Sequence, residues 1–160
     1  WYHEVKTPLA AALLLTEKLE EEGMKREIQE QLEHIKGRLR SALLGCKLQG
    51  SLFDLQVKET QLAECVKISL RNNRFFLIRK RFTVEVAAEA APVYTDRSWV
   101  VYVLDQLIDN AIKYCVQTPV LKIWSGLEDN HVCLYVEDNG EGIKDRDIRR
   151  IFEKGFTGNS

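Results

Sequence analysis

Apolar residues between Trp1 and Gln49 recur at the alternating four- and three-residue spacing of helices that pack side by side. The spacing is regular in the second half of this stretch, at Ile28, Leu32, Ile35, Leu39, Ala42 and Cys46. A looser version in the first half uses Val5, Leu9, Ala12, Thr16 and Leu19. We expect Gly23 to end the first helix, because glycine is favoured just past a helix end. The pattern predicts a helical hairpin over residues 1–50.

Two helices alone leave part of their apolar surface in water. Burial against a second copy would produce a four-helix bundle, and this is the arrangement that we expect for residues 1–50. The alternative is a hairpin whose apolar surface is covered by the rest of the same chain. The two arrangements differ in whether the protein is a homodimer.

The pattern changes after Gly50-Ser51 to short β-rich runs separated by longer helical ones. The predicted strands cover residues 56–60, 82–86, 93–95, 120–127 and 132–137. The predicted helices cover residues 62–77, 97–114 and 144–152. Strands that alternate with helices able to cover one sheet face indicate an α/β sandwich. We therefore predict an α+β protein with a hairpin domain at 1–50 and a second domain at 51–160.

Composition narrows the function without defining it. The chain has 160 residues, of which 45% are hydrophobic and 29% charged, and its 23 Lys and Arg nearly balance 24 Asp and Glu. The net charge of -1 gives no reason to bind nucleic acid. The four cysteines form no C-x-x-C pair, so no zinc or redox motif is indicated. No apolar run approaches the roughly 20 residues of a membrane helix, so we expect a cytoplasmic segment whose membrane anchor lies elsewhere.

The first motif that carries chemistry is His3-Glu4-Val5-Lys6-Thr7-Pro8. On a helix, Thr7 lies one turn from His3 and on the same face. A neutral imidazole has a nitrogen lone pair that can attack phosphorus, and the carboxylate of Glu4 can orient the ring and take its proton. The other interpretation is an ordinary surface pair near the start of a helix. His34 and His131 are read as structural or solvent-exposed residues.

Two further motifs favour a nucleotide site. Gln106, Asn110 and Lys113 are spaced by four and three, so two amides and an ammonium share one helix stripe. Amide oxygens suit Mg²⁺ and a lysine suits a phosphate chain, although an exposed polar face would look the same. Asp138-Asn139-Gly140-Glu141-Gly142 follows a strand, and its carboxylate could accept from an amine such as that of adenine. A plain Asn-Gly turn is the alternative.

In their order and spacing these motifs resemble the conserved boxes of the sensor histidine kinases, from His3 to Ser160. His3 to Pro8 is similar to the phosphoacceptor box and Gln106 to Tyr114 to the nucleotide box. Asp138 to Ile143 is similar to the first Gly box, Phe152 to Phe156 to the Phe box, and Thr157-Gly158 to the start of the second Gly box. The sequence from Trp1 to Leu9 is most similar to that of membrane-anchored kinases that respond to peptide antibiotics alongside a transporter.

The resemblance implies a fold and a reaction. The second domain would be an ATP-binding domain of the GHKL type, a fold class that histidine kinases share with other ATPases. The chain would phosphorylate itself on His3 with ATP and Mg²⁺, and pass the phosphate to an aspartate in the receiver domain of a response regulator. Implied partners are a second copy, that regulator and a transporter.

The resemblance also implies a role for each matching residue. His3 would be the phosphorylated residue, Glu4 its acid-base partner, and Thr7 the residue that helps water attack the phosphorylated regulator. Asn110 would hold Mg²⁺, Lys113 would contact phosphate and Tyr114 would line the nucleotide site. Asp138 would bind the adenine amine, and Gly140 and Gly142 would shape its pocket. Thr157 and Gly158 would belong to the lid over the phosphates.

Two departures from the family pattern matter. Gln106 stands where many members have Asn, which puts direct metal coordination from that position in doubt. The chain stops at Ser160 inside the lid, so we expect the ATP-binding domain to be incomplete at its C-terminus. Two other functions stay open: a GHKL-type ATPase, disfavoured because Gln106 cannot take a proton from water, and a non-catalytic dimerisation scaffold.

Overall fold

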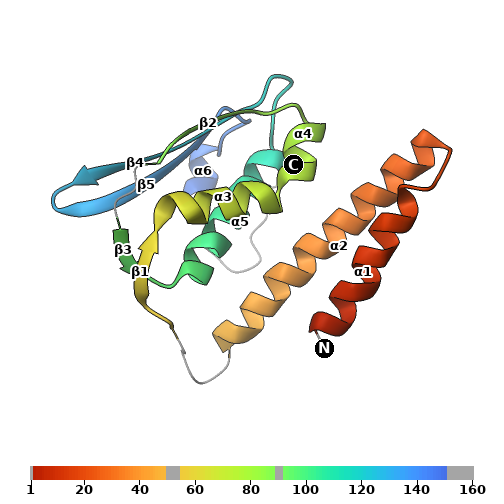
Figure 1. Cartoon of the computed structure of the whole chain (residues 1–160). Coiled ribbons are helices and arrows are strands. Elements are labelled where there is room, and N and C mark those ends of the chain that lie inside the picture. The colour runs from red at the N-terminus through yellow and green to blue at the C-terminus, as the bar shows by residue number, and fades with distance from the viewer. Residues whose placement is uncertain (1, 50–54, 89–91, 151–160) are drawn as a thin grey trace.

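Two antiparallel helices open the fold, as the hairpin pattern predicts. The structure is a computed structural model that describes residues 2–49, 55–88 and 92–150, and the side chains of 5–42, 55–88 and 92–150. Helix α1 covers Tyr2–Thr16 and helix α2 covers Glu22–Gln49. The two helices lie side by side, and α2 is the one nearer the rest of the molecule (Figure 1). The predicted boundary between domains at residues 50 and 51 lies outside the described residues.

The turn between the two helices comes earlier than the sequence predicts. Gly23 does not end the first helix but lies inside α2, which begins at Glu22. The chain leaves α1 at Thr16, whose hydroxyl donates to the Leu13 carbonyl at 2.6 Å. A hydroxyl bonded to the backbone three residues earlier competes with helix continuation. Glycine is a poor helix residue, but one placed in the first turn is tolerated because the carboxylate of Glu22 favours the helix N-terminus.

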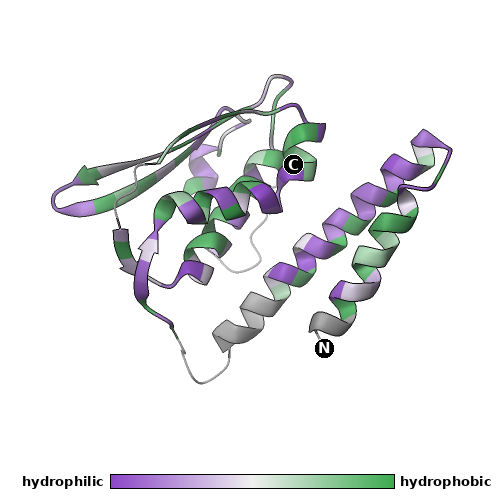
Figure 2. Cartoon of the chain, in the orientation of Figure 1, coloured by the Kyte–Doolittle hydropathy of each residue, from purple (hydrophilic) through white to green (hydrophobic). Residues whose placement is uncertain are grey.

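The hairpin leaves a large apolar surface in water. The looser apolar positions of α1, at Val5, Leu9 and Ala12, are half-buried, whereas Leu14 and Leu15 are 63% and 62% exposed. In α2 the regular positions Ile28 and Ile35 are 37% and 47% exposed. Hydrophobic residues extend over much of α1, while α2 is mostly hydrophilic (Figure 2). In this single chain, part of the predicted packing surface therefore has no cover.

The second module places helices against one face of a sheet. Its central sheet has strand order β2-β4-β5, in which β2 (Thr83–Ala87) pairs in parallel with β4 (Val120–Glu128) and β4 pairs antiparallel with β5 (His131–Asp138). A smaller antiparallel pair joins β1 (Lys58–Gln61) to β3 (Pro92–Thr95). Helices α3 and α5 lie together on one side of the central sheet (Figure 1). This arrangement is the predicted α/β sandwich.

The core of the module forms between the sheet and helices α3 (Leu62–Asn72) and α5 (Arg97–Lys113). Helix α5 contributes side chains at the spacing of one helix face, and β4 contributes alternate residues, as half-covered elements do. The buried cluster is Cys65, Val66, Leu77, Leu104, Ile108, Ala111, Ile112, Leu121 and Ile123. The polar stripe of α5 is thereby fixed on the face away from the core.

Three predicted elements of the second module differ from the structure by two residues or more, and the others by one residue at most at either end. The helix predicted over 62–77 is divided into α3 and α4 (Arg74–Arg79) at Asn73. The Asn73 side chain shares the Ser69 carbonyl with its own backbone amide, at 2.9 and 3.1 Å, and its ψ of 5° departs from the helical value. The strand predicted over 56–60 corresponds to β1, which begins only at Lys58. The helix predicted over 144–152 is the short α6 (Asp145–Ile148), and residues 151 and 152 lie outside the described part.

Asp96 fixes the start of α5. One carboxylate oxygen accepts from the Ser98 amide at 2.8 Å and the Trp99 amide at 3.4 Å, and the other accepts from the Gln56 amide at 3.0 Å. Burial raises the pKa of Asp96, but these hydrogen bonds together outweigh it, so its pKa lies below the ordinary value. A carboxyl group whose pKa is lowered by folding stabilises the folded protein at any pH above its ordinary pKa. This stabilisation is lost as the pH falls through the lowered pKa.

We predict that Asp96→Ala lowers the free energy of unfolding by about 1 kcal/mol at neutral pH, because it removes the acceptor at the helix start. Asp96→Asn keeps a side-chain oxygen and should lose less. Urea unfolding at pH 7 and at pH 3 measures both variants, and the deficit of Asp96→Ala should shrink at the lower pH. Equal stability of the three proteins at pH 7 would contradict this role.

Candidate functional site: the C-terminal end of α5 and the glycine loop

Helix α5 carries the residues of the predicted nucleotide site, but they do not share one environment. Asn110 and Lys113 are exposed on its last turns, and Tyr114 follows directly as the residue that ends the helix. The Lys113 ammonium lies 4.8 Å from the centre of the Tyr114 ring. Gln106, one turn earlier, is half-buried and donates through Nε2 to the Ser41 hydroxyl of α2 at 3.1 Å. Asn110, Lys113 and Tyr114 thus form one exposed group, and Gln106 lies apart from it.

The predicted glycine loop follows β5 and is held to β4 by one side chain. Asn139 accepts through Oδ1 from the Val120 amide at 2.7 Å and donates through Nδ2 to the Thr118 carbonyl at 3.0 Å. Asp138, exposed at the strand end, accepts from the Gly140 amide at 2.8 Å. A carboxylate has about four acceptor sites, so this bond leaves it able to accept from a ligand as well. Gly142 has a φ of 72°, which favours glycine.

The glycine loop meets the end of α5 directly. The Glu141 amide donates to the Tyr114 carbonyl at 3.0 Å. A side chain at Gly140 would begin 2.6 Å from Asp138 Oδ1 and 2.7 Å from the Tyr114 carbonyl oxygen, so only glycine fits. Two motifs that lie about 25 residues apart in the sequence are therefore joined by a backbone hydrogen bond. The end of α5, which carries Asn110, Lys113 and Tyr114, therefore lies next to the loop that follows Asp138.

The remaining predicted site residues lie elsewhere. His3 and Glu4 belong to the first turn of α1, and Thr7 is exposed one turn further along. Figure 1 shows α2 between α1 and the second module. Thr157 and Gly158 lie outside the described residues. Among the described residues, no helix has the length and hydropathy that a membrane crossing requires.

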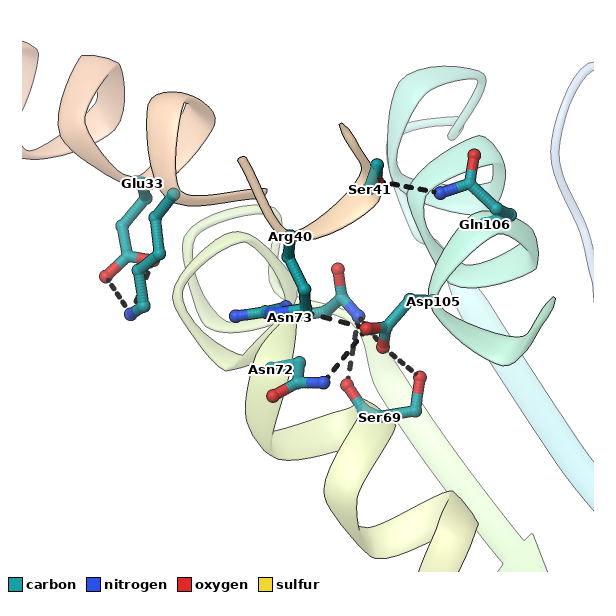
Figure 3. A network of polar contacts seen from close by, with 9 residues as sticks. Glu33, Arg40, Ser41, Ser69, Asn72, Asn73, Asp105 and Gln106 are labelled. Carbon is teal, nitrogen blue, oxygen red and sulfur yellow. Dashed lines mark hydrogen bonds and ion pairs between the residues drawn. The ribbon is translucent and has the colours of Figure 1, made fainter. Parts of the chain in front are cut away.

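A buried carboxylate next to Gln106 is a feature that the motifs do not reveal. Asp105 is 8% exposed and accepts from the Ser69 hydroxyl at 2.5 Å, the Asn72 amide at 2.9 Å and the Asn73 amide at 3.1 Å. Arg40 of α2 approaches the same carboxylate at 3.5 Å (Figure 3). A buried charge is stable only when paired and hydrogen-bonded. The sequence could have indicated this feature, because Asp105 is a carboxylate on the side of an amphipathic helix that faces the core.

Comparison with known proteins identifies this second module. Residues 95–160 match the family described as histidine kinase-, DNA gyrase B-, and HSP90-like ATPases. The sensor protein BceS of Bacillus subtilis is 32% identical over 157 residues, which are 98% of this chain and 47% of BceS. The sensor histidine kinase GraS of Staphylococcus haemolyticus is 31% identical over 97% of this chain and 45% of GraS. The chain thus spans about half the length of these relatives.

Solved structures agree with this assignment. The catalytic domain of the histidine kinase ThkA aligns with 64% of this chain and 71% of its own at a TM-score of 0.58 and 25% identity. The Acinetobacter baumannii histidine kinase AdeS aligns with 91% of this chain and 76% of its own at a TM-score of 0.56 and 26% identity. The second module therefore has the fold of the histidine-kinase-like ATPases. The similarity to sensor histidine kinases extends over nearly the whole chain.

We predict that Gly140→Ala lowers the free energy of unfolding by about 1 to 3 kcal/mol, as overpacking usually does, because the added carbon must displace the Tyr114 carbonyl or Asp138. Gly23→Ala is the control, since no atom lies within 4 Å of its added carbon. Chemical unfolding compares the two. A loss no larger in Gly140→Ala than in Gly23→Ala would show that the loop adapts without cost.

Proposed function

We propose that this chain is the catalytic part of a kinase that transfers the γ-phosphate of ATP to His3, and from His3 to an aspartate of a response-regulator receiver domain. The observation that carries the proposal is the junction of Tyr114 with Gly140 and Glu141. It joins the two motifs of the nucleotide site in a chain whose relatives are sensor kinases. The relatives and solved structures described above are sensor kinases, which argues against an ATPase that only hydrolyses ATP.

The nucleotide site assigns a separate task to each exposed group. Asp138 accepts a hydrogen bond from the adenine amine, and the loop between Gly140 and Gly142 lets the base approach the backbone. Lys113 neutralises phosphate charge. The side-chain amide oxygen of Asn110 suits Mg²⁺, which prefers oxygen ligands and keeps part of its water shell. Asn110, one helical turn before Tyr114, and Lys113, directly before it, are both exposed, which fits a ligand that reaches the site from solvent.

The chemistry at the phosphoacceptor uses three residues of α1. A ring nitrogen of His3 forms the bond to the γ-phosphorus while the bond to the bridging oxygen breaks and ADP leaves. Glu4 takes the proton that the ring loses. Thr7, one turn along the helix, orients the water that removes phosphate from the regulator. The ATP-binding module supplies the phosphate but no nucleophile.

The exposed apolar residues of the hairpin support a homodimer. Leu14 and Leu15 of α1, with Ile28 and Ile35 of α2, would be covered in a four-helix bundle of two chains. A regulator would then meet the bundle beside His3. We also propose that this segment works on the cytoplasmic side of a membrane-anchored kinase that acts together with a transporter, as the likeness of residues 1–9 suggests.

A non-catalytic scaffold is the second candidate, and phosphorylation separates it from the kinase. We predict that His3→Gln abolishes incorporation of label from γ-labelled ATP in the full-length protein. Binding of an ATP analogue should stay nearly intact, since His3 and the nucleotide residues lie in different modules. His131→Gln, at the start of β5, is the matched control and should keep the label. Label that persists in His3→Gln would show that His3 is not the phosphorylated residue.

We predict that Asp138→Asn weakens binding of an ATP analogue by roughly 10- to 150-fold, because it removes a charge-assisted hydrogen bond worth about 1.5 to 3 kcal/mol. Asp129→Asn is the control. Asp129 lies in the turn between β4 and β5, at the end of that hairpin away from Asp138, and Asn also tolerates its φ of 44°. Calorimetric titration gives both dissociation constants. Equal constants would mean that adenine lies elsewhere.

A further inference from the structure

The face of α2 that meets the ATP-binding module carries a stripe of polar residues. Arg79 of α4 pairs with Glu30 at 2.7 Å and donates to the Arg26 carbonyl at 3.3 Å. The ring of His34 lies 4.6 Å from that of Phe76. At the other end of the stripe Ser41 accepts from Gln106. These α2 residues, which we call the docking stripe, are Arg26, Glu30, His34 and Ser41, spaced by four, four and seven.

Two contacts of α2 reach the nucleotide helix itself. Arg40 approaches Asp105, and Ser41 accepts from the adjacent Gln106 (Figure 3). Asp105 is also tied to α3 by Ser69, Asn72 and Asn73, so it stays fixed in the module whether or not Arg40 is present. Gln106 has a different position, because it belongs to the nucleotide box and its side chain is directed to the hairpin.

Docking of this kind is reversible. The elements that pack most extensively lie within the hairpin or within the module, not across the two. Apart from the ring contact of His34 with Phe76, the contacts described above are polar. The Arg79–Glu30 pair keeps roughly a third of both side chains in water, and an ion pair of this exposure contributes little to stability. Arg40 also keeps roughly a third of its side chain in water, beside a carboxylate that three other donors already satisfy. The docked arrangement also leaves α2 between the module and α1 (Figure 1), so delivery of phosphate to His3 requires the module to leave this position or to serve another chain.

We propose that docking of α2 on α5 and nucleotide binding compete through Gln106, so that Ser41 and Arg40 lower the affinity of the ATP site. This inference rests on the proposed function. While Gln106 donates to Ser41, the Gln106 amide cannot turn toward a bound nucleotide. The hydrogen bond between Gln106 and Ser41 must break before Gln106 can contact the nucleotide. By linkage, a nucleotide that binds the undocked state better releases the hairpin to the same extent. A glutamine reaches one methylene further than the asparagine common at this position, which suits it to contact α2.

The test measures the dissociation constant of a non-hydrolysable ATP analogue with Mg²⁺ by calorimetry in the full-length protein. Ser41→Ala and Arg40→Ala should each bind about two- to tenfold more tightly than the wild type, the range expected for loss of one hydrogen bond or partly exposed ion pair. Arg38→Ala removes an exposed arginine from the same helix and should leave the constant unchanged. Alanine favours helices, so these variants should fold.

A double-mutant cycle isolates the role of Gln106. Gln106→Asn keeps an amide at the nucleotide box but shortens its reach, and in this background Ser41→Ala should have no further effect. Arg40→Ala should likewise have no further effect in this background, because Gln106 is the group through which docking and nucleotide binding compete. If the wild type binds the analogue, and Ser41→Ala and Arg40→Ala bind it with the same dissociation constant as the wild type, this inference is wrong but the proposed function is not affected. A wild type that binds no nucleotide overturns the proposed function and this inference with it.

Discussion

Burial of one face of α5 between α3 and the central sheet positions both the nucleotide residues and the contact with the hairpin. Leu104, Ile108 and Ala111 enter the core, which leaves Asn110 and Lys113 in water. Burying apolar area is worth roughly 25 cal/mol per Å², and the surrounding close packing fixes the helix rotation. The C-terminal end of α5 then meets the glycine loop through the Tyr114 carbonyl. A rotation of α5 would lose the core and the site together.

The same constraint explains why a charge can be buried at Asp105. It lies at the edge of the core face of α5, where Ser69, Asn72 and Asn73 of the α3 end supply three donors. A buried carboxylate with fewer partners would be costly. Asn73 serves two purposes, because its side-chain amide also donates to the Ser69 carbonyl, at the point where α3 ends. The end of α3, the orientation of α5 and the approach of Arg40 therefore depend on one cluster.

Residue patterns predicted the elements and the sandwich well where periodicity was strong. The α5 face and the alternation of Leu121 and Ile123 in β4 could be read from spacing alone. The break at Asn73 and the turn before Glu22 could not, because each depends on a side-chain hydrogen bond to the backbone that has no periodic signal. The motifs predicted Asn110, Lys113 and Asp138, yet the contact of Gln106 with Ser41 joins positions 65 residues apart and needs the tertiary structure.

Transfer of phosphate to His3 is tested most directly by the chemical identity of the phosphorylated residue. The full-length protein would be incubated with γ-labelled ATP and Mg²⁺, digested, and its labelled peptide sequenced and tested for stability. We expect one labelled peptide that contains His3, with a label that acid removes and base does not. An acid-stable label, or a label on a peptide without His3, would show that His3 is not the phosphoacceptor.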